Sequence, residues 1–244
     1  MSGIRKLKVK LFADGADLAG IKEMAGNPAI AGFTTNPTLM RKAGVADYKA
    51  FALQVLDVVG NRPISFEVFA DDFAEMEKQA LEIASWGKNV NVKIPVTNTK
   101  GEFCGPLVER LSRAGVQINV TAVMTNDQVR RITDKLALET PAIVSVFAGR
   151  IADTGRDPVP LMAEAVAILK SKPKAELIWA SPRELLNVFQ ADAVGCHIIT
   201  ATNDIIKKLS LVGKDLDAYS LETVEMFYKD AKAAGYSIAA RSAA

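Results

Sequence analysis

With 244 residues, of which 49% are hydrophobic and 24% are charged, the sequence has the size and composition of a globular protein with one large core. The 30 Lys and Arg residues nearly balance the 28 Asp and Glu residues, and no basic block alternates with aromatic side chains, so we expect no nucleic-acid-binding surface. No apolar run is long enough to span a membrane, so we also expect no membrane partner.

Short apolar runs that are rich in β-branched residues recur along the chain. They are almost continuously apolar, which is typical of parallel strands that are buried on both faces. The eight predicted strands are Val9–Ala13, Ala31–Thr34, Ile64–Val68, Val90–Ile94, Ile118–Thr121, Ile143–Phe147, Leu177–Ala180 and Cys196–Thr200.

Between these runs the spacing of apolar residues changes to that of helices. Phe73, Met76, Ala80 and Ile83, for example, fall on one face of an amphipathic helix. Further helical faces occur at 129–136 and 162–169. Residues that favour helix starts precede all three segments, namely Asp71 and Asp72, Thr125 to Asp127, and Asp157 with Pro158.

Eight strand–helix units in a chain of this length predict an α/β fold of the (β/α)8 barrel type, also called a TIM barrel. A doubly wound sheet is the main alternative. After the last strand, the apolar spacing predicts an extra C-terminal helix over Leu221–Ala234. We find no linker-like composition and predict one domain, with the barrel at 1–220 and the C-terminal helix and tail at 221–244.

The chain start and the cysteines bear on location and metal binding. Residues Met1–Leu11 lack the apolar run of a secretory signal. Cys104 and Cys196 lie far apart without neighbouring ligands, so we expect reduced, structural cysteines and a cytoplasmic protein. His197 is the only histidine, and we predict no metal site.

Polar residues occur at or just after the ends of the predicted strands. In a barrel of this type the active site lies at the C-terminal ends of the strands, so these side chains would converge. They are Asp14, Asn36, Glu67, Lys93, Asn119, Thr121, Ser145, Arg150, Ser181 and Arg183.

Lys93 is the most informative of these residues. It lies within Asn91–Val96, which otherwise has the pattern of a core strand. A buried lysine is rare because its ammonium is costly to desolvate, and burial favours the neutral amine that attacks carbonyls to form a Schiff base. The alternative is a strand-end lysine that extends into solvent.

The acidic and amide residues have alternatives of their own. Asp14 and Glu67 could each cap a helix or form a surface ion pair. Asn119 and Thr121 are two residues apart on one strand, so they share a face and could form a buried hydrogen-bonded pair.

The cationic residues suggest an anion site. Arg150 and Arg183 taken singly are typical of exposed loops, and Ser181 before Pro182 is typical of a helix start. Taken together, a serine at a helix N-terminus with two arginines resembles a phosphate-binding site.

Six segments complete the pattern and lie at 12–14, 32–39, 92–97, 118–121, 147–153 and 180–183. In order and spacing they resemble the transaldolase family over nearly the whole chain. The stretches TTNPTL and VKIP are specific, whereas the serine and arginine fragments alone are weak. Chain length and the C-terminal helix resemble the small-subunit branch, which includes fructose 6-phosphate aldolases as well as true transaldolases.

The resemblance implies a role for each site residue. Lys93 would form the Schiff base. Asp14 would accept the proton of the donor's C4 hydroxyl, and Glu67 would act through a water held by Thr121. The dihydroxyacetone part would be held by Asn36, Asn119 and Ser145, and the phosphate by Arg150, Ser181 and Arg183. Because the iminium serves as the electron sink, the resemblance implies no cofactor.

Two positions bear on the type of reaction. Family aldolases that release free dihydroxyacetone tend to have glutamine at the position of Glu67 and tyrosine at that of Phe147, so both positions resemble transaldolases. Three departures from the family pattern, Val146, Pro182 and Thr202, leave open a specialised relative that acts on another anionic sugar. A lyase-type aldolase and a non-catalytic sugar-phosphate-binding barrel are further alternatives. The branch also implies a homo-oligomer, with a decamer as the expected form.

Overall fold

The computed structural model describes residues 7–238, and the chain divides into two compact units. The larger extends to Lys208 and holds every described strand, whereas the smaller begins at Leu209 and holds the C-terminal helix. That the two units act as one domain stays a prediction. No helix within residues 7–238 is both long and apolar enough to cross a membrane.

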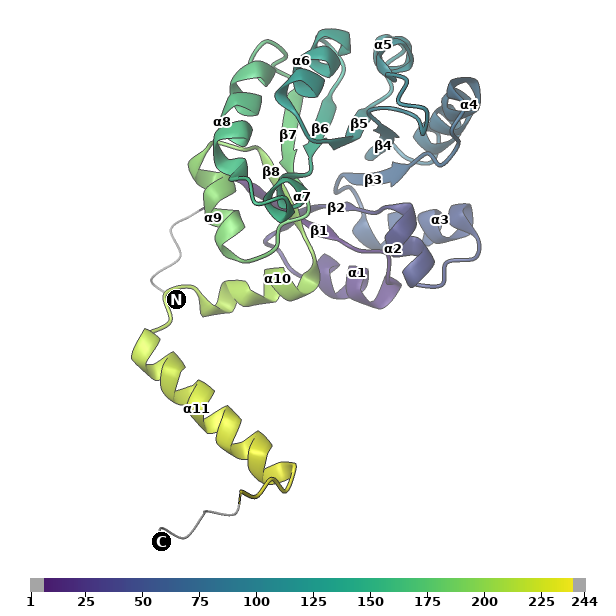
Figure 1. Cartoon of the computed structure of the whole chain (residues 1–244). Coiled ribbons are helices and arrows are strands. Elements are labelled where there is room, and N and C mark those ends of the chain that lie inside the picture. The colour runs from purple at the N-terminus through teal and green to yellow at the C-terminus, as the bar shows by residue number, and fades with distance from the viewer. Residues whose placement is uncertain (1–6, 239–244) are drawn as a thin grey trace, which may run out of the picture. The chain divides into compact units, whose positions relative to one another are not determined.

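The eight strands of the larger unit close into a barrel in chain order, and all neighbouring strands are parallel (Figure 1). This confirms the (β/α)8 fold and excludes the doubly wound sheet. Each strand begins and ends within two residues of its predicted bounds. The strands are β1 (Lys10–Asp14), β2 (Ile30–Thr34), β3 (Ile64–Glu67), β4 (Val90–Pro95), β5 (Ile118–Val123), β6 (Ala142–Val146), β7 (Ala175–Trp179) and β8 (Ile198–Ala201).

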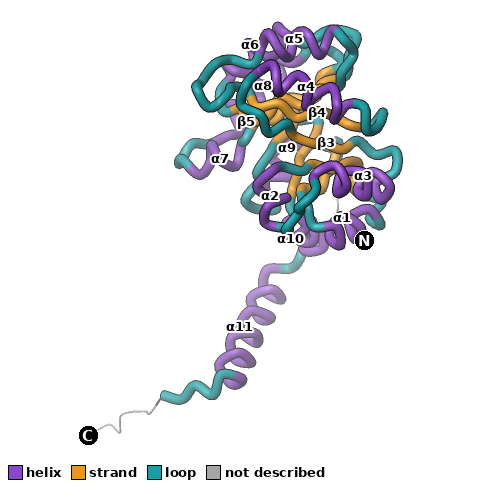
Figure 2. Tube along the Cα trace, turned by 90° about the vertical axis from the view of Figure 1, so that its right-hand side faces the viewer, coloured by secondary structure: helices purple, strands orange, loops and turns teal. Residues whose placement is uncertain are grey.

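Helices surround the strands, as Figure 2 shows for the purple helices around the orange strands. The helices of the larger unit are α1 (Leu18–Ala25), α2 (Pro37–Lys42), α3 (Tyr48–Val59), α4 (Phe73–Ala84), α5 (Gly105–Arg113), α6 (Asn126–Lys135), α7 (Ala148–Asp153), α8 (Pro158–Leu169), α9 (Leu186–Ala193) and α10 (Asn203–Lys207). A 3-10 turn at Lys208–Leu211 follows.

Three predicted helix starts are confirmed by their capping bonds. Asp72 accepts from the backbone N–H groups of the first turn of α4, and Asp157 does the same at α8. Thr125 and Gln128 form a reciprocal capping box at α6. Each cap satisfies N–H groups that have no partner within the helix, which fixes where the helix begins.

The C-terminal helix α11 runs over Leu216–Ala233 and so begins five residues before its predicted start. It begins there because the side chain of Asp215 accepts from the N–H of Ala218. Leu216 and Tyr219 lie three residues apart, at helical spacing, in the part of the helix that precedes the predicted start.

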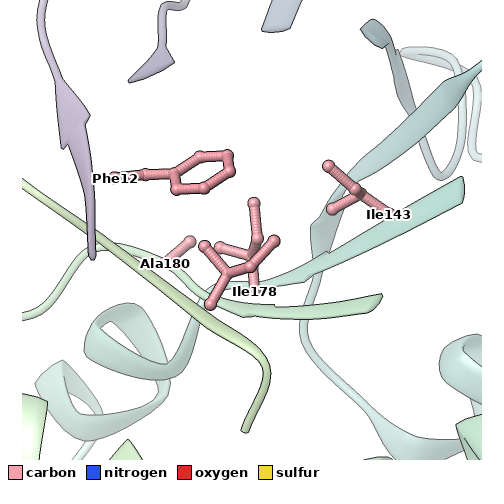
Figure 3. Packing of buried hydrophobic residues seen from close by; sticks show 5 residues of the cluster. Phe12, Ile143, Ile178 and Ala180 are labelled. Atoms are coloured by element: carbon pink, nitrogen blue, oxygen red, sulfur yellow. The ribbon is translucent and has the colours of Figure 1, made fainter. Parts of the chain in front are cut away.

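An apolar cluster of buried residues fills part of the barrel interior. Phe12 of β1, Ile143 of β6 and Ile178 of β7 cluster with Ile198 of β8 and with Ala180, which directly follows β7 (Figure 3). Gly32 makes room for the Phe12 ring, because a Cβ at that glycine would lie 2.4 Å from the ring's Cζ. Because Ala180 at the C-terminal end of β7 also lines the cavity described below, this apolar cluster borders the site.

Candidate active site

A cavity of about 500 Å³ opens at the C-terminal ends of the barrel strands. Strand, turn and helix residues from several βα units line it, as expected for a functional site in this fold. Of the eleven predicted site residues ten line the cavity, and these are Asp14, Asn36, Glu67, Lys93, Thr121, Ser145, Phe147, Arg150, Ser181 and Arg183. The remaining one, Asn119, is fully buried and bonds to Ser145.

Lys93 lies within β4, and only 5% of its surface is exposed. Its Nζ donates a hydrogen bond to the carbonyl oxygen of Thr35 at 2.9 Å and lies 3.2 Å from Oε2 of Glu67. The strand register places Glu67 and Lys93 side by side on β3 and β4. The lysine is therefore buried with two oxygen partners rather than extended into solvent, as a buried amine requires.

Asp14 faces the cavity from the end of β1. Its Oδ1 accepts a hydrogen bond from Oγ1 of Thr34 at 2.7 Å, and that hydroxyl lies 2.5 Å from Oγ1 of Thr200. Burial raises the pKa of the Asp14 carboxyl above its ordinary value, against the opposing effects of the Lys93 charge and the Thr34 hydrogen bond. A carboxylate whose pKa is raised binds a proton more readily than an ordinary aspartate, which suits a group that accepts and returns one.

Three buried polar side chains on β6, β5 and β3 form a hydrogen-bonded chain that begins at the cavity wall. Oγ of Ser145 donates to Oδ1 of Asn119 at 2.7 Å, and Nδ2 of Asn119 donates to Oγ of Ser65 at 2.9 Å. Such a chain fixes the amide orientation of Asn119 and the position of the Ser145 hydroxyl. Asn119 therefore pairs with Ser145 and Ser65, and not with Thr121 as the sequence alternative had it.

Thr121 lines the cavity from β5. Its Oγ1 is buried and has no hydrogen-bond partner among residues 7–238. The next residue, Ala122, has a φ of 61°, and the register between β5 and β6 shifts at this point. Because bulges re-aim side chains next to functional sites, this one explains how β5 presents a hydroxyl to the cavity.

Asn36 lies between β2 and α2 and caps the helix. Its Oδ1 accepts from the N–H of Leu39 at 3.0 Å, and Pro37 occupies the first helical position. The cap uses the amide oxygen of Asn36, a residue that also lines the cavity.

Two arginines, Arg150 and Arg183, line the cavity. Arg150, in α7, stands with its guanidinium carbon 5.3 Å from the centroid of the Phe147 ring. Arg183 forms a two-point ion pair with Asp153, in which Nε donates to Oδ1 at 3.0 Å and Nη2 bonds to Oδ2. Both arginines are exposed, so they can meet a ligand that enters from solvent.

The expectation that Ser181 starts a helix is wrong. Ser181 has a φ of 57°, and the next helix, α9, begins only at Leu186 without a side-chain cap. An N-cap residue adopts an extended conformation, which a left-handed φ excludes. The loop instead packs against α7, because Gly149 has no Cβ and the Ser181 carbonyl oxygen occupies that space. Ser181 therefore brings a hydroxyl and a loop to the cavity, and no helix N-terminus.

The comparisons with known proteins agree with this geometry. A family model described as Transaldolase/Fructose-6-phosphate aldolase matches residues 11–240. The chain belongs to this family. A "Probable transaldolase" of Dehalococcoides mccartyi is 36% identical over 202 residues, which are 82% of this chain and 90% of that protein. Another, of Caldicellulosiruptor saccharolyticus, is 35% identical over 205 residues, which are 83% of this chain and 89% of that protein.

A structural comparison supports the fold alone. A solved chain described as a "putative phosphonomutase from Burkholderia cenocepacia J2315" superposes with a TM-score of 0.53 at 10% sequence identity, covering 91% of this chain and 94% of that one. At this identity the likeness carries no information about the reaction.

The transaldolase-family site contains three residues to which the sequence assigned no role. Thr34 and Thr200 link β1, β2 and β8 through their hydroxyls and hold Asp14. The alternation of side chains along β8 could have predicted that Thr200 points into the barrel, because it lies two residues after the inward-pointing Ile198. Lys42, at the end of α2, adds a cation to the cavity wall, and no sequence pattern singled it out.

Proposed function

We propose that the chain is a transaldolase, which forms a Schiff base through Lys93 and transfers a dihydroxyacetone unit from a ketose phosphate to an aldose phosphate. The observation that carries the proposal is the buried Lys93 amine, which lines the cavity 3.2 Å from the Glu67 carboxylate. A lysine amine that lines a cavity beside a carboxylate has a proton acceptor within reach when it attacks a carbonyl to form a Schiff base.

The first half of the reaction uses both carboxylates. The Lys93 amine adds to the C2 carbonyl of the donor, and loss of water from the carbinolamine gives an iminium, with Glu67 exchanging the protons. The unpaired Oγ1 of Thr121 positions the water that leaves. Asp14 then takes the proton of the C4 hydroxyl while the C3–C4 bond breaks. The bonding electrons move into the iminium, which becomes an enamine, and the aldose phosphate departs.

The second half reverses these steps with another aldehyde. The enamine carbon attacks the carbonyl carbon of the acceptor, and Asp14 returns its proton to the new hydroxyl. Water then adds to the iminium with help from Glu67, which releases the ketose phosphate and the free lysine. Protein residues perform each step, so the proposal includes no cofactor and no metal.

The substrate is held at two places in this proposal. The dihydroxyacetone hydroxyls are held by Asn36, Asn119 and Ser145. Arg150 and Arg183 bind the phosphate through charge-assisted hydrogen bonds, with the Ser181 hydroxyl beside them. The ion pair with Asp153 supports this role for Arg183, because it orients the guanidinium while other N–H donors stay available.

The proposed substrates are sedoheptulose 7-phosphate or fructose 6-phosphate as donor, and glyceraldehyde 3-phosphate or erythrose 4-phosphate as acceptor. These sugars place the enzyme in the pentose phosphate pathway of the cytoplasm.

Fructose 6-phosphate aldolase is the second candidate, since the family description covers both activities. Phe147 favours transfer over release. Its ring lines the cavity without a hydroxyl that could protonate the enamine, so the enamine should persist until an aldehyde arrives. Glu67 and the names of the relatives point in the same direction.

Borohydride trapping tests the chemistry. Incubation with fructose 6-phosphate and borohydride should add the reduced dihydroxyacetone or hexose phosphate mass to the peptide that contains Lys93. Lys93→Arg keeps the cation and should abolish the adduct. An adduct on Lys88 or Lys100 instead would contradict the assignment. Coupled assays for erythrose 4-phosphate consumption and for free dihydroxyacetone then separate transferase from lyase.

We also propose a homo-oligomer, with a decamer as the expected form. Support comes from α11, which exposes Leu221, Val224, Phe227 and Tyr228. Exposed apolar side chains in such number are typical of interaction surfaces. Light scattering would measure the mass of the assembly, and a monomer at micromolar concentration would contradict the proposal.

A further inference from the structure

The hydroxyl of Tyr48 forms two hydrogen bonds with the backbone of Glu67. It accepts from the Glu67 N–H at 2.9 Å and donates to the Glu67 carbonyl oxygen at 2.8 Å. Backbone groups at this point of a barrel strand normally pair with the neighbouring strand. At Glu67, the last residue of β3, the phenol of Tyr48 therefore supplies the hydrogen-bond partners that the backbone of the neighbouring chain segment would otherwise supply.

The strand register shows what the phenol displaces. The Thr35 N–H donates to the Ser65 carbonyl, and in a parallel ladder the next bond would run from the Glu67 N–H to the Thr35 carbonyl. That bond is absent from the described structure, because the Glu67 N–H bonds to Tyr48. The Thr35 carbonyl instead accepts from Nζ of Lys93 at 2.9 Å.

Tyr48 is itself held firmly in place. It is the first residue of α3, whose start is fixed by Asp47, with Oδ1 accepting from the Ala50 N–H at 2.9 Å. Its ring lies 5.5 Å from that of Phe69 and 5.9 Å from that of Trp86, measured between centroids. Burial raises the pKa of the phenol, so the hydroxyl keeps the proton that it donates.

We infer that Tyr48 is a positioning residue for Lys93 and Glu67. Its hydroxyl takes up the backbone groups of Glu67, and this leaves the Thr35 carbonyl free to hold the Lys93 amine beside the Glu67 carboxylate. The inference rests on the proposed Schiff-base function and adds a residue outside the cavity lining. It predicts that loss of one hydroxyl misplaces both reacting side chains, although neither of them contacts the Tyr48 side chain through its own functional group.

The test compares two variants around the same ring. Tyr48→Phe keeps the ring and removes the hydroxyl, whereas Phe69→Leu changes the packing of the ring and keeps both hydrogen bonds. Each variant is assayed for transfer from fructose 6-phosphate to erythrose 4-phosphate. Rates are expressed per site that borohydride traps after long incubation, so that unfolded protein is not counted. Thermal unfolding is recorded in parallel.

Tyr48→Phe should lower kcat roughly 10- to 100-fold, the size of effect that misplaced reacting groups produce, with KM changed less than about threefold. The rate at which the Lys93 adduct appears should fall with kcat, while Phe69→Leu stays near the unmodified rate. In a Glu67→Gln background the loss caused by Tyr48→Phe should shrink, because residues that act through one another are not additive.

Four results would count against these ideas, and they are distinguishable. If Tyr48→Phe matches the unmodified protein per trapped site, or if its loss is undiminished in the Glu67→Gln background, the positioning role is wrong and the proposed function stands. If Phe69→Leu lowers the transfer rate per trapped site as much as Tyr48→Phe does, the aromatic rings around Tyr48 serve stability alone. If the unmodified protein forms no adduct on Lys93, the proposed function fails and the positioning role with it.

Discussion

Gly149→Ala tests whether the contact between α7 and the Ser181 loop builds the phosphate end of the site. A Cβ at this position would lie 1.5 Å from the Ser181 carbonyl oxygen and 2.5 Å from its carbonyl carbon. Real Cβ contacts are essentially never shorter than 3.0 Å, so the oxygen and the new carbon must separate by at least 3.0 − 1.5 = 1.5 Å. The two Ser181 atoms belong to the backbone, and the position of an alanine Cβ is fixed by its own backbone, so no rotamer change can relieve the clash.

A shift of this size would move either Arg150 or the Ser181 loop out of contact with the substrate phosphate that both are proposed to bind. A hydrogen bond of about 2.8 Å that lengthens by 1.5 Å is broken, and a charge-assisted contact contributes roughly 1.5–3 kcal/mol. We therefore expect kcat/KM for fructose 6-phosphate to fall about 10- to 150-fold, whereas kcat/KM for unphosphorylated fructose should change little. The overpacking should also lower the stability of the fold by about 1–3 kcal/mol.

The assay measures both substrates on the same preparation, normalised to the fraction of protein that borohydride traps on Lys93. Gly26→Ala is the matched control. A Cβ there would meet its nearest atom, the Glu23 carbonyl oxygen, at 3.4 Å, so both activities should be retained. Equal losses with the phosphorylated and the unphosphorylated sugar would refute the reasoning, because they would show that Gly149 supports the whole barrel mouth and not the phosphate end.

Arg150→Ala should cost about 1.5–3 kcal/mol in kcat/KM for a phosphorylated ketose and almost nothing for the unphosphorylated one; similar losses for both would point to a structural arginine. Phe147→Tyr places a phenol in the cavity and should raise dihydroxyacetone release relative to transfer in coupled assays; an unchanged ratio would remove Phe147 from the choice of reaction. Nδ1 of His197 accepts from the Leu177 N–H at 3.0 Å, and burial lowers the pKa of this imidazole, while Glu176 opposes and Lys10 assists the shift. Its contribution to stability should be present above the unfolded pKa of about 6.5 and be lost as the pH falls toward the folded pKa, because the unfolded state binds the proton more readily. Urea unfolding at several pH values should show this loss, and His197→Asn should flatten it; equal slopes in both proteins would contradict the assignment.

Much of the barrel could be predicted from local pattern. Parallel strands buried on both faces are continuous apolar runs, and each of the eight appeared within two residues of its observed bounds. Helix starts with an aspartate or a threonine cap were equally visible, because capping depends on residues only two or three positions apart. Lys93 stood out for a similar reason, since a charged residue within an apolar strand is unusual wherever the strand lies.

Contacts between distant segments were not visible. The sequence placed Ser181 at a helix start because serine before proline is typical of one, yet the close approach of Gly149 and the left-handed φ of Ser181 belong to a loop. The hydrogen-bond partners of Asn119 were not visible either. Spacing offered Thr121 on the same strand as one alternative, whereas the hydrogen bonds run to Ser145 on β6 and Ser65 on β3.

By itself the sequence determined the order and bounds of the strands, the end of the barrel at which polar side chains gather, and the singular position of Lys93. These features depend on side-chain alternation and helix periodicity, which are local. Only the tertiary structure decided which groups meet: Asp14 with Thr34, Glu67 with Lys93, and Tyr48 with the Glu67 backbone across a sequence separation of 19 residues. Closure of the barrel sets these distances, because the shared register of all eight strands decides which side chains lie opposite one another.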